Sequence, residues 1–153
     1  MRTLVSGPLL ALLLVCSPAQ SQGPRYYAPN GPFTLTDNKL LCELMASDPA
    51  LERAGFASFA TEVSEQLRLE NLAQKIIWKQ VPEKVRCGST SLQLQQKGYG
   101  NSLDSLGRSP DGQLAAFAGG YLYGPMHGGG GECIFRRDEA SWKLEGCLRT
   151  WDV

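Results

Sequence analysis

The sequence predicts an α+β domain with about three N-terminal helices packed on a C-terminal antiparallel sheet of four to five strands. Up to Trp78, apolar residues recur at helical spacing. After Pro82, the apolar segments become shorter and are separated by turn-forming residues, as is typical of strands. Helices followed by strands in hairpin order indicate an α+β fold, with the helices packed on one face of the sheet, rather than alternating parallel units.

The first 21 residues have the pattern of a secretory signal peptide. Arg2 precedes an apolar run from Leu4 to Val15, and Ala19-Gln20-Ser21 supplies the small residues that a signal peptidase reads. The run is shorter than the ~20 residues needed to cross a bilayer. We therefore expect an exported protein, periplasmic or secreted, without an integral membrane segment after cleavage. Cys16 resembles a lipidation site, but Val15 stands where such sites carry a small residue.

The remaining chain predicts one domain preceded by a short arm. Residues 22–33 contain three prolines and two glycines, which predict an extended arm, and residues 34–153 have the size of a single domain. Removing Arg2 with the signal leaves 15 − 1 = 14 basic and 15 acidic side chains, a net charge of −1. This balance gives no basic stripe for a nucleic-acid partner.

The helical region extends over residues 36–78 and starts at a threonine cap, Thr34 or Thr36. The apolar stripes predict the helices, and their members are Leu40, Leu41, Leu44, Met45, then Phe56, Phe59, Ala60, Val63, Leu67, then Leu69, Leu72, Ala73, Ile76, Ile77. The third stripe is displaced from the second by one residue. We therefore expect a break near residues 67–71.

The strands follow Trp78. Short segments at 84–87 and 91–96, the apolar segment 113–124, and a terminal hairpin around residues 138–141 predict the sheet. The polar stretch 98–112 is expected to be a loop ending in a Pro110-Asp111-Gly112 turn.

Four cysteines remain after the signal peptide, namely Cys42, Cys87, Cys133 and Cys147. An even number in an exported chain indicates two disulfides, with three pairings open. Loop lengths favour Cys133 with Cys147 and Cys42 with Cys87. If Phe135 pairs with Leu144, the alternation of side chains places Cys133 and Cys147 on opposite faces, so their bridge requires a bulge or a register change.

The segment GPMHGGGG at 124–131 is the first candidate site. No lysine and no helix follow it, as a phosphate-binding loop would need, and the single histidine lacks a second histidine for zinc. We therefore predict no catalytic residue, metal or cofactor. We expect a flexible hairpin loop that binds a partner through Met126, His127, Gly128, Gly129 and Gly130.

An aromatic wall is the second candidate site. Alternation places Tyr121 and Tyr123 on one face of a strand, and Trp142 and Trp151 lie in the terminal hairpin. Tyrosine and tryptophan are enriched at interfaces. The carboxylate of Glu132 is expected to be solvated.

These features favour an exported, non-catalytic protein that binds another protein, such as a periplasmic inhibitor or an immunity-type protein. The alternative is a small-molecule-binding or hydrolytic domain with a pocket between the sheet and the helices.

Overall fold

The structure is a computed structural model that describes residues 31–47, 59–95 and 100–152. It is an α+β fold in which the helices precede the sheet. Two helices lie in the described residues, rather than the expected three: α1 (Leu35–Ser47) and α3 (Val63–Ala73). The strands are β1 (Ile77–Gln80), β2 (Lys84–Cys87), β3 (Thr90–Gln93), β4 (Gly100–Arg108), β5 (Leu114–Gly124), β6 (His127–Asp138) and β7 (Ser141–Asp152).

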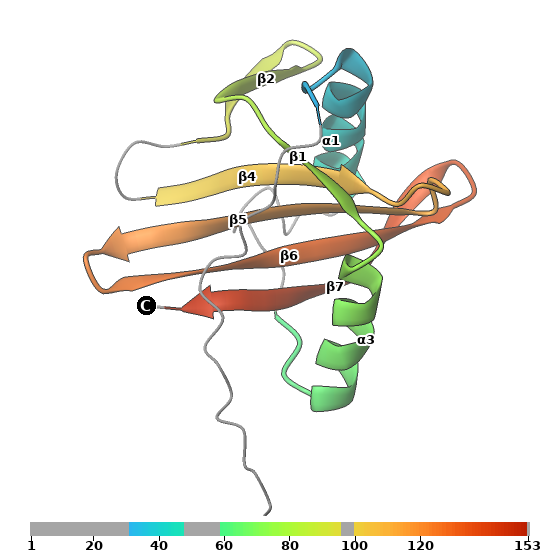
Figure 1. Ribbon diagram of the computed structural model, residues 1–153. Helices are drawn as coiled ribbons and strands as arrows, with labels where there is room; N and C mark the ends of the chain where they lie inside the picture. The colour runs from blue at the N-terminus through green and yellow to red at the C-terminus, as the bar shows by residue number, and fades with distance from the viewer. Residues whose placement is uncertain (1–30, 48–58, 96–99, 153) are drawn as a thin grey trace, which may run out of the picture.

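Five strands form one antiparallel sheet in the order β1-β4-β5-β6-β7, and β2 and β3 form a separate hairpin. In Figure 1, α1 and α3 both lie toward one end of the long strands, and the β5–β6 turn lies at the other end. The sheet therefore has a helix-covered end and an end where its turn projects.

Each face of the sheet carries its own hydrophobic core, because alternate residues of β5 belong to different clusters. Ala115 and Phe117 pack with α1, whereas Ala116 and Ala118 pack with α3. The two helices therefore cover opposite faces. This corrects the expectation that both would lie on one face.

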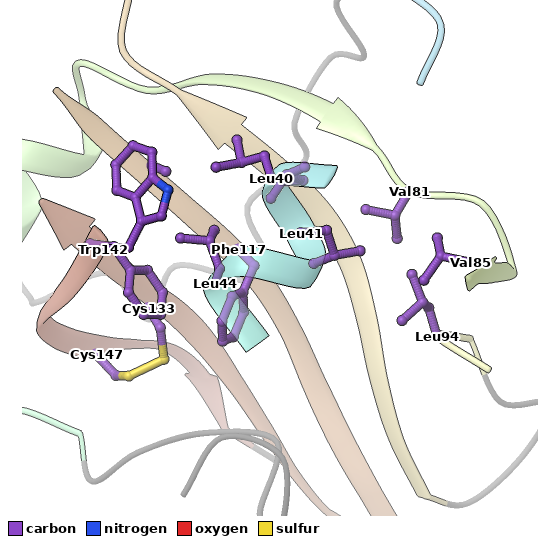
Figure 2. Close-up of a cluster of buried hydrophobic side chains, with 13 residues drawn as sticks. Leu40, Leu41, Leu44, Val81, Val85, Leu94, Phe117, Cys133, Trp142 and Cys147 are labelled. Atoms are coloured by element: carbon purple, nitrogen blue, oxygen red, sulfur yellow. A yellow bond between two sulfur atoms is a disulfide. The ribbon is translucent and has the colours of Figure 1, made fainter. Parts of the chain in front are cut away.

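The core under α1 also holds the β2–β3 hairpin in place. Leu41 and Leu44 of α1 are fully buried, and Figure 2 shows them beside Phe117, with Val85 and Leu94 nearby. Phe33, the last residue of the expected arm, packs against this core. Residues 22–30 of the arm and residues 1–21 lie outside the described residues.

Helix α3 follows the third apolar stripe rather than the second. Leu69 is fully buried, whereas Val63 and Leu67 are 69% and 55% exposed. The predicted break at 67–71 is therefore wrong. The chain is non-helical at Phe59, which forms a bridge with Cys147 of β7, and α3 begins after it. The start of the second predicted stripe lies outside the described residues.

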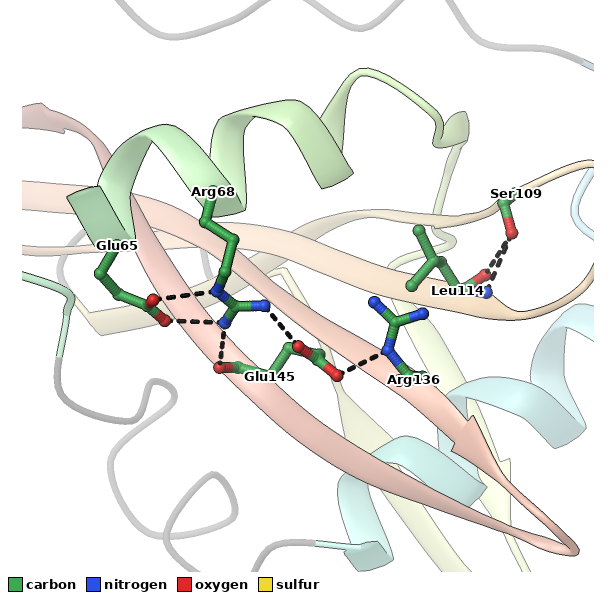
Figure 3. Close-up of polar contacts among 6 residues, drawn as sticks. All are labelled: Glu65, Arg68, Ser109, Leu114, Arg136 and Glu145. Carbon is green, nitrogen blue, oxygen red and sulfur yellow. Dashed lines mark hydrogen bonds and ion pairs between the residues drawn. The ribbon is translucent and has the colours of Figure 1, made fainter. Parts of the chain in front are cut away.

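Two strands were missed by the sequence patterns. Ile77 was assigned to a helix, but it begins β1, and residues 100–108 of the expected loop form β4. The Pro110-Asp111-Gly112 turn is confirmed, because the Gly112 amide donates to the Ser109 carbonyl at 3.0 Å and Gly112 has φ +71°. Across this turn, the Leu114 amide donates a hydrogen bond to the Ser109 hydroxyl (Figure 3).

Both favoured disulfides are present. Cys42–Cys87 ties α1 to β2, and Cys133–Cys147 joins β6 to β7. Phe135 does pair with Leu144, and a bulge between Ile134 and Phe135 restores Cys133 opposite Cys147.

The bulge is held by an ion-pair network at Glu145. Its carboxylate accepts hydrogen bonds from Arg68 of α3 and from Arg136 of β6, the latter at 2.7 Å (Figure 3). Gly146, the next residue, has φ +153°, where a side chain is disfavoured. Gly146 therefore permits the backbone conformation of the bulge, and the ion pairs of Glu145 link the bulge to α3 and to β6.

Asp37 is the polar centre of the helix-covered end. Thr34 caps α1, because its hydroxyl accepts from the Asp37 amide and its own amide donates to the Asp37 carboxylate at 2.8 Å. Lys79 and Arg108 donate to the same carboxylate at 2.8 and 3.2 Å. Burial opposes ionisation of Asp37, but these hydrogen bonds outweigh it and lower its pKa to about 2.

Among the helices of the described residues, none is long and apolar enough to cross a membrane.

Candidate functional site

Five glycines lie side by side across β5 and β6, at the end of the sheet away from the helices. We call them the glycine platform: Gly119, Gly120, Gly129, Gly130 and Gly131. Gly119 pairs with Gly131, and Gly120 pairs with Gly130. All five are buried.

The expectation of a flexible loop at 124–131 is therefore wrong for most of its residues. His127 begins β6, and Gly128, Gly129 and Gly130 continue it, with β5 on one side. Gly129 and Gly130 also pair with β7 on the other side. The turn itself is only Pro125-Met126, closed by the Gly124–His127 pair.

The platform consists of glycines because other groups occupy the space of their side chains. A Cβ on Gly130 would lie 2.2 Å from Nε1 of Trp151, and one on Gly119 would lie 2.1 Å from the Ser102 carbonyl oxygen. On Gly131, a Cβ would lie 2.5 Å from the ring of Phe59. The glycines thus form a flat patch of backbone, with the Trp151 ring on one face and the Phe59 ring on the other.

Beyond the platform, the β5–β6 turn projects with its apolar side chains exposed. We define the hairpin tip as residues 122–127. Leu122, Tyr123 and Met126 are 40%, 67% and 80% exposed. Residues 119–131 contain no Asp, Glu, Lys or Arg. The tip is therefore an uncharged, apolar projection carried by a paired strand.

The predicted aromatic wall is only half assembled. The rings of Tyr121 and Tyr123 are tilted against each other with centroids 5.3 Å apart, and Tyr123 donates to Asn101 at 3.3 Å. Trp142 pairs instead with Arg137 at the other end of the sheet, where the guanidinium lies 5.2 Å from the ring centroid. Trp151, the other tryptophan of the predicted wall, is the one that lies over the glycine platform.

A cleft of about 220 Å³ lies beside Trp151, and we call it the Trp151 cleft. Its wall includes Ser102, Asp104 and Tyr121. Partial burial of its carboxyl group disfavours the charged form and raises the pKa of Asp104 above the ordinary value, and a hydrogen bond from Ser102 opposes this only in part. This cleft therefore carries acidic rather than basic character.

On the other face of the platform lies a cation, the guanidinium of Arg149 near the C-terminal end of β7. Arg149 lies 4.9 Å above the ring of Phe59 and donates to both carboxylate oxygens of Asp152, at 2.9 and 2.8 Å. Phe59 in turn covers Gly131. These contacts pack the platform on the face that carries Tyr121.

Glu132 was expected to be solvated, but it is fully buried. It pairs with Ala118 and Leu148, and it lies between these two core residues on the face covered by α3. The alternation of β6 requires this, because Cys133 points into the opposite core.

Within 31–47, 59–95 and 100–152, no group of three His, Cys, Asp or Glu side chains could hold a metal ion. His127 is exposed at the start of β6.

No protein-family model matches the chain, and comparisons with curated proteins and with solved structures find no significant match. The site is therefore interpreted from its own geometry.

Proposed function

We propose that the chain is an exported binding protein that captures another protein by inserting the hairpin tip into an apolar recess of that partner. The observation that carries this proposal is the tip itself, which exposes Leu122, Tyr123 and Met126 at the end of a long, paired hairpin. Tyrosine and methionine are enriched at protein interfaces.

The platform supports the proposal because it limits the cost of binding. A flexible glycine loop would lose about 1–2 kcal/mol of backbone entropy per residue on being ordered. Here Gly129 and Gly130 are already fixed between β5 and β7. The tip is thus presented in one conformation, which favours affinity.

The absence of charge from residues 119–131 defines the chemistry of the partner. Moving an uncharged tip from water into an apolar recess costs little free energy of desolvation. In a strongly charged pocket, the same tip would leave the charged groups of the partner buried without a partner of opposite charge. An enzyme cleft or a toxin surface with an apolar hollow fits this requirement. The signal-like segment at 1–21 and two disulfides agree with export.

The test compares two sets of surface changes. Leu122→Ser, Tyr123→Ser and Met126→Ser are combined in one tip variant, and Val63→Ser with Leu67→Ser on α3 serve as the matched control, since both sets replace exposed apolar residues. Oxidised proteins are used to capture binding partners from envelope extracts.

We expect the wild type and the α3 control to retain the same stoichiometric protein, and the tip variant to lose it. A photocrosslinker placed at Met126 should attach to that protein, and one at Leu67 should not. Equal retention by the tip variant, or no retained protein, would contradict the proposal.

A further inference from the structure

A second cleft, unrelated to the hairpin tip, lies between α1 and the two turns at the helix-covered end of the sheet. It has a volume of about 260 Å³, and we call it the Trp142 cleft. The side chains that matter for its chemistry are Lys39, Leu40, Glu43, Arg108, Arg137 and Trp142.

The charges of this cleft are unequal. Lys39, Arg108 and Arg137 bring three cations, and Glu43 brings one carboxylate. Lys39 lies 3.9 Å from Glu43, a long contact in which the lysine side chain stays 80% exposed. The lining alone therefore carries an excess of two positive charges.

Neighbouring carboxylates do not remove this excess. Asp37 contacts Arg108 at 3.2 Å, but it also accepts from Lys79 at 2.8 Å, so one buried carboxylate serves two cations. Asp111, beside the lining residue Gly112, accepts from two neutral donors, the Ser109 hydroxyl and the Gln113 amide, so it keeps its negative charge and lowers the excess from two positive charges to one.

The donors of Arg137 are held in place for a ligand. Its guanidinium lies over the ring of Trp142, and its Nε donates to the Glu139 carbonyl at 3.3 Å. A guanidinium has five N–H donors, and this contact takes one. Trp142 is itself fixed, because its indole N–H donates to Glu43 at 3.2 Å and the ring is 9% exposed.

We propose that the Trp142 cleft binds a small organic oxyanion, with its carboxylate or phosphate groups held by Arg137, Arg108 and Lys39. A guanidinium recognises both kinds of oxyanion through two parallel N–H···O bonds. The volume lies just below the roughly 300–1,000 Å³ of pockets for drug-sized ligands, so the ligand is a metabolite-sized anion. Leu40 and Trp142 provide an apolar wall for its carbon skeleton.

The test uses citrate and glycerol phosphate as probes, added at constant ionic strength against sodium chloride. Binding is followed by NMR at the indole N–H of Trp142, assigned with Trp142→Phe. We expect a saturable shift of this signal with at least one probe, while the indole signals of Trp78 and Trp151 stay unchanged. Saturation by citrate alone identifies a carboxylate ligand, and saturation by glycerol phosphate alone identifies a phosphate ligand.

Arg137→Gln and Lys39→Gln should each raise the dissociation constant about tenfold, since each removes a charge-assisted hydrogen bond. Lys143→Gln, an equal charge change in the same terminal hairpin but outside the lining, is the matched control and should leave it unchanged. The tip variant should also bind the probe normally, which separates this site from the proposed function. No saturation with either probe, or equal binding by Arg137→Gln, would overturn the proposal.

Discussion

The two ends of the sheet are stabilised in different ways. At the helix-covered end, large side chains fill the space between sheet and helices, and two disulfides and the ion pairs of Asp37 and Glu145 link the elements. At the other end, the glycine platform removes side chains so that Trp151 and Phe59 can lie directly on the backbone.

This difference shows how the molecule can expose apolar residues on a fixed structure. At the helix-covered end, burial of apolar side chains stabilises the fold. At the platform, the structure depends instead on backbone pairing of β6 with β5 on one side and with β7 on the other. The hairpin tip therefore does not depend on its own side chains for its conformation. Leu122, Tyr123 and Met126 remain available for a partner.

The largest expected effect concerns the two disulfides, which differ in exposure. Cys133 and Cys147 are fully buried, whereas Cys42 and Cys87 are partly exposed. Mild reduction of the native protein should open Cys42–Cys87 first. Its cysteines are separated by 45 positions in the sequence, so its loss should cost about 4 kcal/mol through the greater freedom of the unfolded chain.

Differential alkylation with mass spectrometry gives the order of reduction, and denaturant unfolding gives the stability. Cys42→Ser with Cys87→Ser should reproduce the loss. If Cys133 is alkylated before Cys42, the Cys133–Cys147 disulfide is the more accessible of the two, and the predicted order of reduction is wrong.

The second prediction concerns the platform. Gly119→Ala should lower the free energy of unfolding by about 3 kcal/mol, because the added methyl would overlap the backbone of Ser102 and Leu103, which cannot move freely. Gly124→Ala in the same strand is the control, since its nearest neighbour, the Cβ of His127, lies at 3.9 Å. Urea denaturation of both variants measures the difference. Equal stabilities would mean that the platform is loosely packed.

The third prediction concerns Asp37 and pH. Its folded pKa of about 2 lies below the ordinary value of 3.8 for an aspartate, so its contribution to stability is present above pH 4 and is lost as the pH falls toward 2. Asp37→Asn should cost about 2 kcal/mol at neutral pH. The deficit should shrink on acidification.

Unfolding curves from pH 7 to pH 2 measure this deficit. Asp152→Asn serves as the control, because Asp152 forms an exposed pair with Arg149 that should contribute at most about 1 kcal/mol. A deficit of Asp37→Asn that is independent of pH would contradict the role of its charge.

Several features of the helix-covered end could be predicted from the sequence, because their causes are local. Thr34 caps α1, Pro110 to Gly112 form the turn, and the conflict between Phe135–Leu144 pairing and the Cys133–Cys147 bridge required the bulge that the structure contains. Each of these depends on residues close together in the chain.

The strand β4 was missed because its own bulge hides the alternation. Leu103 and Leu106 both pack against the core under α1, although they are three residues apart, since the register shifts between Leu103 and Ser105. A spacing of three does not predict a strand.

The glycine platform could not be predicted for a different reason. Glycine has a low preference for strands, and a run of four therefore favours a loop. Glycine is required at positions 130 and 131 of β6 because Trp151 and Phe59 occupy the space of their side chains. Both aromatic residues are distant in the sequence. For the same reason, Trp142 was grouped with Tyr121. Tyr121 pairs with Gly129 of β6, whereas Trp142 pairs with Arg137, which lies 137 − 129 = 8 residues further along that strand.

Amide hydrogen exchange at Gly129, Gly130 and Gly131, measured by NMR, tests most directly whether the hairpin tip is carried by a fixed platform. The structure predicts slow exchange, comparable to that of Ile134 in the same strand, because β6 is paired on both sides. Exchange at the rate of an unprotected peptide amide would show that this segment is a mobile loop, and it would contradict the proposed mode of binding.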